Sequence, residues 1–273
     1  MTRRFIPPTM TLPSPTATPG ASALRDRVVL ITGATGGMGA PLARACAQAG
    51  ATVVLHARVV RKLEALYDEI VAAQGPQPII LPLDLGHAEA RDFADTASAV
   101  QAQLGRLDAV VHCAAQLGAL APFEHQAFPS WQSVFRVNVT AAAGLTRAMM
   151  ALLNASPDAS VVFTLDHRGE TPRAYWGPYA ASKAALTALA RELADEWENR
   201  PGLRINAIVP GPINSPLRMQ THPGEDRSQL PRADALVPLY LHLLGGQRKD
   251  ESGALIDAQA WLRGEDCVSA LRK

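Results

Sequence analysis

A tyrosine and a lysine stand four positions apart at Tyr179 and Lys183. On a helix this spacing places both side chains on one face, within reach of a common substrate. A free tyrosine has a pKa of about 10, so a neighbouring ammonium group is needed before its phenol can transfer protons near neutral pH. The pair is a candidate acid/base centre. The alternative is an ordinary surface helix that carries both residues by chance.

A glycine-rich turn near the start of the chain favours the first interpretation. Residues 27–31 predict a buried strand, and Thr-Gly-Ala-Thr-Gly-Gly-Met-Gly follows at 32–39. Glycines at such a turn let the backbone approach a pyrophosphate, while the N-terminus of the next helix offers free N–H groups and a positive dipole. A strand, a glycine turn and a helix in this order form a dinucleotide-binding motif. The predicted cofactor contacts in it are Gly33, Thr35, Gly37, Met38 and Gly39.

These motifs, in their order and spacing, resemble the short-chain dehydrogenase/reductase family over about residues 27–258. The resemblance also includes Asn138, Asp84-Leu85 after a third strand and Pro210-Gly211 after a sixth. Within the family, segments 176–183 and 253–258 look most similar to the bacterial YciK-like oxidoreductases. The motifs are jointly specific for fold and cofactor, and much less so for the substrate.

The resemblance implies a role for each matching residue. Tyr179 would be the catalytic acid/base, Lys183 would orient the ribose and lower the tyrosine's pKa, and Asn138 would hold a proton-relay water. Asp84 would contact the adenine, although an Asp after a strand is also an ordinary turn residue. The remaining cofactor contacts that the resemblance implies are Leu85, Pro210 and Gly211.

Length and composition agree with a single α/β domain. The chain has 273 residues, 48% of them hydrophobic, which is enough for one large core. With 26 basic and 25 acidic residues the formal net charge is +1, so there is no electrostatic case for nucleic acid or an anionic membrane as the main partner. The cysteines form no C-x-x-C pair and the histidines have no ligand spacing. This argues against a disulfide framework and a metal site, and it predicts that the protein resides in a reducing cytoplasm.

Residues 1–22 differ from the rest of the chain, because they are crowded with proline, threonine and serine and have no hydrophobic period. We expect this tail to be disordered and the catalytic domain to occupy residues 23–273. Prolines interrupt the apolar run that an export signal after Arg3-Arg4 would need. No run of about 18 apolar residues occurs, so a membrane span is not expected.

Short apolar runs alternate with longer amphipathic ones from residue 27 onward. This alternation predicts a single Rossmann-type, doubly wound parallel sheet of about seven strands with helices on both faces. One long helix over about 175–199 carries Tyr179 and Lys183 near its start, and its apolar side is interpreted as core or subunit contact. The resemblance implies that this helix packs against its symmetry mate in a homodimer or homotetramer. The predicted strands lie near 27–32, 52–56, 79–82, 108–113, 160–165, 204–209 and 254–258.

The end of the second strand indicates which nicotinamide cofactor is bound. An NAD enzyme normally places a carboxylate there for the adenosine ribose hydroxyls. Residues 52–58 contain no acid: Ala57 stands at the usual position of the aspartate, and Arg58 follows it, with Arg61 and Lys62 nearby. Such cations would pair with a 2′-phosphate, so NADP(H) is preferred and NAD(H) is the second choice. A solvated charge at the strand end is the alternative interpretation of Arg58.

Asp166 is the main departure from the family. It lies thirteen positions before Tyr179, where the family has a serine that hydrogen-bonds the substrate carbonyl. An ionised Asp166 would repel a developing alkoxide and raise the pKa of Tyr179, whereas a protonated Asp166 could donate a hydrogen bond to the carbonyl. Thr164 is the nearest hydroxyl, and we do not expect it to replace the serine fully. The third possibility is that Asp166 pairs with a neighbour, namely His167, Arg168 or Arg173.

A second departure follows the fourth strand, where the family usually has Asn-Ala-Gly and this chain has Cys113-Ala114-Ala115. The loss of the amide removes a hydrogen bond between neighbouring strands, and the loss of the glycine narrows the approach of the backbone to the cofactor. Cys113 is interpreted as a buried structural thiol, because no base for a reactive cysteine is identifiable.

The sequence therefore predicts an NADP(H)-dependent oxidoreductase that moves hydride between nicotinamide and a small carbonyl or alcohol substrate. The alternative is an NADP(H)-binding sensor or interaction protein of the same fold with impaired turnover, which the two departures favour and the matching tyrosine, lysine and asparagine oppose. No motif identifies the substrate. Residues 212–231, which should cover the pocket, form a proline- and charge-rich loop. Its Arg218 and Arg227 could attract an anionic substrate, and the alternative is that they are solvated loop charges.

Overall fold

The structure, a computed structural model, describes residues 10–17, 20, 22–200, 202–246 and 251–271. These residues contain one eight-stranded sheet in the order β3-β2-β1-β4-β5-β6-β7-β8. Neighbouring strands are parallel except for β8, which runs antiparallel to β7. The strands are β1 (Val28–Thr32), β2 (Thr52–Ala57), β3 (Ile79–Pro82), β4 (Ala109–His112), β5 (Ala159–Thr164), β6 (Leu203–Val209), β7 (Ala254–Asp257) and β8 (Val268–Ala270).

The predicted doubly wound parallel sheet is confirmed, with a correction to its strand number from about seven to eight. The additional strand β8 has only 3 residues, which is too short to produce a periodic signal in the sequence. The central strands were found from sequence because helices cover both of their faces, so nearly every residue is apolar. Every residue of β1 and of β4 is buried.

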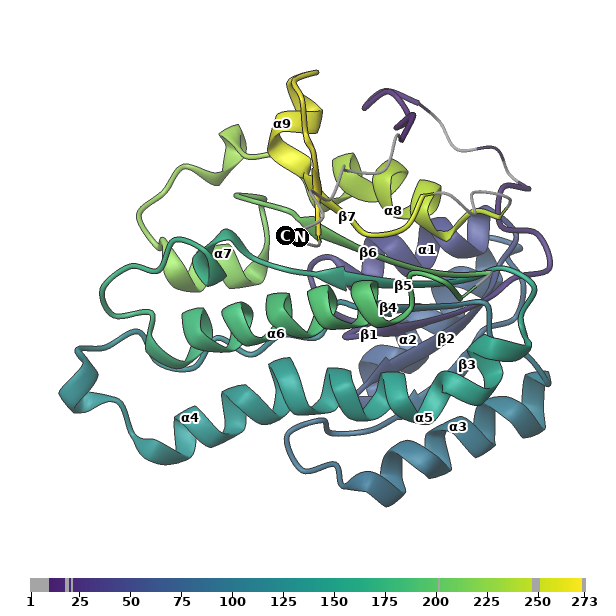
Figure 1. The fold of residues 1–273 in the computed structure, drawn as a ribbon, viewed down its shortest axis with the longest axis horizontal. Coiled ribbons are helices and arrows are strands. Elements are labelled where there is room, and N and C mark those ends of the chain that lie inside the picture. Colours follow the sequence, from purple (N-terminus) through teal and green to yellow (C-terminus); the bar gives the residue numbers. More distant parts are fainter. Residues whose placement is uncertain (1–9, 18–19, 21, 201, 247–250, 272–273) are drawn as a thin grey trace.

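Helices cover both faces of the sheet and divide the hydrophobic core into two clusters, one against each face. One layer contains α1 (Gly39–Gln48), α2 (Val60–Ala72) and α8 (Val237–Leu244). The other contains α3 (Ala90–Leu104), α5 (Ala141–Ala155) and α6 (Gly177–Glu196). Figure 1 shows α5 and α6 on one side of the strands and α1 and α8 on the other. The predicted long helix over about 175–199 corresponds to α6.

The carboxyl ends of the strands meet at one edge of the sheet, where chemistry is expected. The strand order reverses beside β1, since β1 pairs with β2 on one side and with β4 on the other. In open α/β sheets this reversal opens a crevice at the carboxyl ends, because successive loops leave in opposite directions. Short elements surround this edge: α4 (Phe128–Phe135), a π-helical turn (Arg136–Thr140), α7 (Pro216–Thr221) and α9 (Ala258–Leu262).

Part of the predicted N-terminal tail lies among the described residues, whereas residues 1–9, 18–19 and 21 lie outside them. Met10 and Leu12 pack against the hydrophobic core, and the indole Nε1 of Trp261 on α9 donates a hydrogen bond to Pro13 O at 2.8 Å. Composition did not predict these contacts. Among the described helices, none is long and apolar enough to cross a lipid bilayer.

Candidate active site

The glycine-rich turn joins β1 to α1 at the carboxyl edge of the sheet. Gly33 has a φ of +64°, and a Cβ there would lie 2.8 Å from Ala114 Cα in the loop after β4. A Cβ on Gly39 would collide with Gly33 O, and one on Gly37 would lie 2.9 Å from Pro216 Cδ. Glycine is therefore required by close packing at each of these positions, against backbone at Gly33 and Gly39 and, at Gly37, against side chains at the start of α7. Thr35 and Met38 belong to the same turn, and Met38 is buried.

Thr32, immediately before this turn, links β1 to the loop after β4. Its Oγ1 accepts hydrogen bonds from Cys113 N at 3.1 Å and Ala114 N at 3.2 Å. These contacts connect the strands at the point where the family's asparagine is missing. Cys113 itself is a free cysteine, and burial raises the pKa of its thiol to about 11, so the reactive thiolate is disfavoured.

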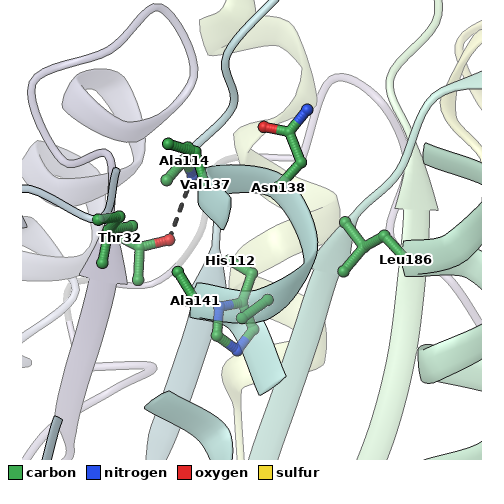
Figure 2. Close-up of a pocket in the computed structure, with 9 residues that line it drawn as sticks. Thr32, His112, Ala114, Val137, Asn138, Ala141 and Leu186 are labelled. Carbon is green, nitrogen blue, oxygen red and sulfur yellow. Dashed lines mark hydrogen bonds between the residues drawn. The ribbon is translucent and has the colours of Figure 1, made fainter. Parts of the chain in front are cut away.

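A small cavity of about 10 Å³ lies behind this edge, between β1, β4, the π-helical turn and α6. In Figure 2, Thr32 and Ala114 lie on one side of it, His112 below and Leu186 opposite. Leu85, one of the predicted cofactor contacts, also lines it. A volume of about 10 Å³ is close to the minimum that one water molecule needs.

Asn138 lies in the π-helical turn and is 1% exposed. Its Oδ1 accepts from Gln116 N at 2.7 Å, and its Nδ2 donates to Gln116 O at 3.0 Å and to Ser182 Oγ at 2.9 Å. The Ser182 hydroxyl in turn donates to Tyr179 O at 2.8 Å. The amide therefore joins the loop after β4 to the start of α6, and π-helical turns of this kind are frequent at functional sites.

Tyr179 and Asp166 are in direct contact. The Tyr179 hydroxyl donates a hydrogen bond to Asp166 Oδ2 at 2.8 Å, while Asp166 Oδ1 accepts from Arg168 N at 2.8 Å and lies 3.3 Å from His167 Nδ1. Burial raises the pKa of Tyr179 well above its usual range, and the charge and the hydrogen bond of Asp166 raise it further. Asp166 thus contacts two of its three predicted partners, His167 and the backbone of Arg168, and also the tyrosine, whereas no contact with Arg173 is present among the described residues.

Lys183 is buried one helical turn beyond Tyr179, with its Nζ 5.8 Å from the tyrosine ring centroid. The Nζ donates to Thr164 O at 3.0 Å. Burial lowers the pKa of Lys183, and the Asp166 charge opposes this shift. Thr164 does not fill the place of the missing serine, because its Oγ1 lies 3.0 Å from Tyr240 Oη on α8 and 3.5 Å from Cys113 Sγ.

The carboxyl ends of β2 and β3 lie farther along the same edge of the sheet. Arg58 is exposed, and its guanidinium has no hydrogen bond or ion pair within the described part of the chain. Asp84 accepts from Gly86 N at 3.0 Å and lies 3.2 Å from His87 Nδ1. The Gly86 hydrogen bond is the main cause of a lowered pKa at Asp84, and the Arg58 charge contributes. Asp84 is therefore the residue that closes the turn after β3.

The loop after β6 faces the glycine-rich turn. Gly211 has a φ of +67°, and Gln259 Nε2 donates to Pro210 O at 2.7 Å and to Pro212 O at 3.3 Å. Gln259 on α9 therefore fixes the backbone of the Pro210-Gly211 turn. No sequence motif indicated Gln259, because it contacts a residue about fifty positions away in the sequence, and only the folded structure brings the two together.

Sequence reasoning also missed an aromatic cluster next to Tyr179. The Trp176 ring lies 5.8 Å from the Tyr179 ring and 6.2 Å from the His222 ring, and the Arg168 guanidinium stacks 4.7 Å from the Trp176 centroid. Arg168 was considered only as a partner for Asp166. A tryptophan three positions before the tyrosine was the available signal, since it shares the helix face. Among the described residues, no cluster of histidine, cysteine, aspartate or glutamate is suited to a metal ion.

A dinucleotide-binding turn and a tyrosine–lysine pair at one edge of a doubly wound sheet define a Rossmann-type oxidoreductase. Residues 27–226 match the short chain dehydrogenase family, and the chain belongs to this family of enzymes. It is 38% identical to the oxidoreductase YciK of Escherichia coli (strain K12), over 88% of this chain and 95% of that protein. The predicted family is thereby confirmed.

Other known proteins agree with this assignment. The chain is 31% identical to the A-factor type gamma-butyrolactone 1'-reductase (1S-forming) of Streptomyces virginiae, over 89% of this chain and 90% of that protein. A solved short chain dehydrogenase from Escherichia coli CFT073, complexed with NADPH, superposes with a TM-score of 0.85 at 38% identity, covering 88% of this chain and 100% of that one.

Proposed function

We propose that this protein is an NADP(H)-dependent oxidoreductase that transfers hydride between nicotinamide and a small carbonyl or alcohol substrate. The observation that carries the proposal is the convergence of Tyr179, Lys183 and Asn138 beside the glycine-rich turn. The bound nicotinamide supplies or accepts the hydride. The chain's own residues bind and orient the reactants and move the proton.

The residues at the sheet edge fit this cofactor. The structure has no room for a side chain at Gly33, Gly37 or Gly39, so the backbone of this turn is open to the approach of a pyrophosphate. Thr35 and Met38 are the other proposed contacts in the turn. Arg58 is exposed and unpaired among the described residues, with no carboxylate beside it in β2, which favours a 2′-phosphate over the free ribose hydroxyls of NAD(H). The other contacts proposed for the cofactor are Asp84, Leu85, Pro210 and Gly211.

In carbonyl reduction Tyr179 donates its hydroxyl proton to the substrate oxygen. Lys183 orients the ribose and stabilises the tyrosinate that forms, and Asn138 holds the water through which the proton is replaced. The raised pKa of Tyr179 keeps its proton in place before the reaction, but it also makes the phenol a weaker proton donor than one whose pKa lies near the working pH. The same shift opposes alcohol oxidation, because that direction needs the tyrosinate as base.

Asp166 gives specific support to a second candidate. The tyrosine's proton is held in a 2.8 Å hydrogen bond to a carboxylate, at the position where the family's serine would donate to the substrate. An ionised group there offers no donor to a carbonyl and repels an alkoxide. The second candidate is therefore an NADP(H)-binding sensor or interaction protein that retains the cofactor site but turns over slowly.

A steady-state assay separates the two candidates. NADPH oxidation is followed with a panel of aldehydes and ketones for the wild type and for Tyr179→Phe. The proposed enzyme shows turnover that the variant loses by at least about a hundredfold, because the proton donor is gone. If NADPH raises the melting temperature of both proteins but neither turns over any member of the panel, the sensor is the better description.

We also propose that two copies of the chain associate through α5 and α6. A surface groove of about 370 Å³ lies between these helices, and its walls include the partly buried apolar side chains Met150, Leu189 and Leu193. The family resemblance implies the same helix as a homodimer or homotetramer contact. Leu189→Arg should lower the mass measured by light scattering to that of a monomer. An unchanged mass would place the interface elsewhere.

A further inference from the structure

Arg168 lies next to the Tyr179–Asp166 pair of the candidate active site. It follows Asp166 by two positions, and its guanidinium stacks 4.7 Å from the centre of the Trp176 ring. That ring is 5.8 Å from the ring of Tyr179. A guanidinium above an aromatic face is attracted by the ring and can still offer its N–H groups to a ligand.

The Arg168 side chain has no polar partner among the described residues. Its Nε is buried without a hydrogen bond, and no ion pair or hydrogen bond is formed by the rest of the guanidinium. Leaving a buried charged donor unpaired is costly. Two other arginines near the site have partners: Arg218 forms a bidentate pair with Glu225, and Arg191 binds Leu271 O and Glu170.

Asp166 does not form an ion pair with the Arg168 guanidinium. Both carboxylate oxygens are engaged by other groups, because Oδ2 accepts from Tyr179 and Oδ1 accepts from the Arg168 backbone N–H and faces His167. His222 lies on the other side of Trp176, at 6.2 Å between ring centres. The Arg168 guanidinium therefore forms no ion pair with a carboxylate among the described residues, and the nearest ionisable neighbours across Trp176 and beside Asp166 are histidines.

We propose that Arg168 binds a carboxylate of the substrate, so that the substrate class is an oxo acid, or the hydroxy acid formed from it. This inference rests on the proposed function, because it concerns the same site. A carboxylate matches the planar fork of the guanidinium with two parallel hydrogen bonds. A phosphate dianion fits less well, because it would bring a second negative charge close to Asp166 while Arg168 supplies only one positive charge.

The test uses two aldehydes that differ in charge and little in shape, 4-carboxybenzaldehyde and methyl 4-formylbenzoate. The kcat/KM of each is measured with NADPH for the wild type, Arg168→Gln, Arg168→Lys and Arg173→Gln. We expect the wild type to prefer the acid by at least about tenfold, as a charge-assisted bidentate contact implies. Arg168→Gln should bring the ratio of acid to ester close to one, and Arg168→Lys should keep part of the preference.

Arg173→Gln is the matched control, because Arg173 is an exposed arginine of the same segment. It removes the same charge and should leave the ratio within about twofold of the wild type, since a screened surface charge acts weakly. Equal ratios in the wild type and Arg168→Gln, or an equal loss in Arg173→Gln, would overturn the inference while leaving the oxidoreductase intact.

If the protein turns over neither aldehyde, a binding measurement tests the inference instead. The melting temperature of the NADPH-bound wild type and of the NADPH-bound Arg168→Lys and Arg168→Gln variants is measured with and without 4-carboxybenzoate. A rise in the wild type that Arg168→Gln lacks supports the carboxylate site although the proposed function has failed. No rise in the wild type overturns the inference. If Arg168→Gln does not fold, the reduced rise in Arg168→Lys takes its place.

Discussion

Replacing Asp166 with asparagine removes a negative charge whose Oδ2 lies 2.8 Å from the Tyr179 hydroxyl and keeps the shape of the side chain. The tyrosine is buried, at 2% exposure, so the interaction is weakly screened. Two unit charges about 4 Å apart interact by about 4 kcal/mol at an effective dielectric constant of about 20. The substitution should therefore lower the pKa of Tyr179, because both the Asp166 charge and its hydrogen bond raise it.

The assay is the pH dependence of kcat/KM for NADP+-linked oxidation of an alcohol that the wild type accepts. This direction requires ionised Tyr179, so the rate rises with pH until the tyrosine is deprotonated. For Asp166→Asn the rising limb should move to lower pH, and the rate at neutral pH should rise by about a hundredfold or more, since about 1.4 kcal/mol corresponds to a factor of ten. Asp166→Ser should gain further in the reductive direction, because the hydroxyl can donate to the carbonyl.

Two controls isolate the charge of Asp166. Glu170→Gln removes a carboxylate of the same segment that pairs with Arg191, and it should leave the pH profile unchanged. The double variant Asp166→Asn with Tyr179→Phe should be inactive, which shows that the shifted limb belongs to the tyrosine. A profile of Asp166→Asn that coincides with that of the wild type would refute the reasoning, since the carboxylate would then have no influence on the proton donor.

Three further predictions concern the cofactor, acid stability and the N-terminal segment. NADPH should raise the melting temperature of the wild type more than NADH does, and Arg58→Asp should reverse this order, because it replaces the partner of the 2′-phosphate by an acceptor for the ribose hydroxyls. An unchanged order would place the phosphate site elsewhere. His56 and His112 are buried, and burial lowers their pKa values to about 4 and about 3. As the pH falls, the unfolded chain protonates its histidines before the folded protein does. The free energy of unfolding measured with urea should therefore decrease between about pH 6.5 and about pH 4, by about 1.4 kcal/mol per pH unit for each of the two histidines. His56→Leu should halve the part of this slope that the two histidines contribute. Deleting residues 1–22 should lower the unfolding free energy by about 1–3 kcal/mol through loss of the Pro13–Trp261 hydrogen bond and of the Met10 and Leu12 packing, and an unchanged urea midpoint would show that the segment contributes nothing.

The sequence alone determined the class of fold and the family of this protein. Parallel strands buried on both faces have to be apolar throughout, and the glycine-rich turn has a fixed order relative to the strand and helix around it. Both signals are local, so they survive without tertiary information. The helix with Tyr179 and Lys183 was predictable for the same reason, because the pair depends only on helical spacing.

Only the tertiary structure decided what surrounds that pair. Whether Asp166 faces the tyrosine or an arginine depends on how the chain leaves β5, and whether Thr164 replaces the serine depends on the face of the sheet toward which it points. The contacts of Arg168 with Trp176, of Gln259 with Pro210 and of Trp261 with Pro13 join segments that no spacing rule connects. Such contacts are set by packing of distant elements, so sequence patterns that act within one element do not encode them.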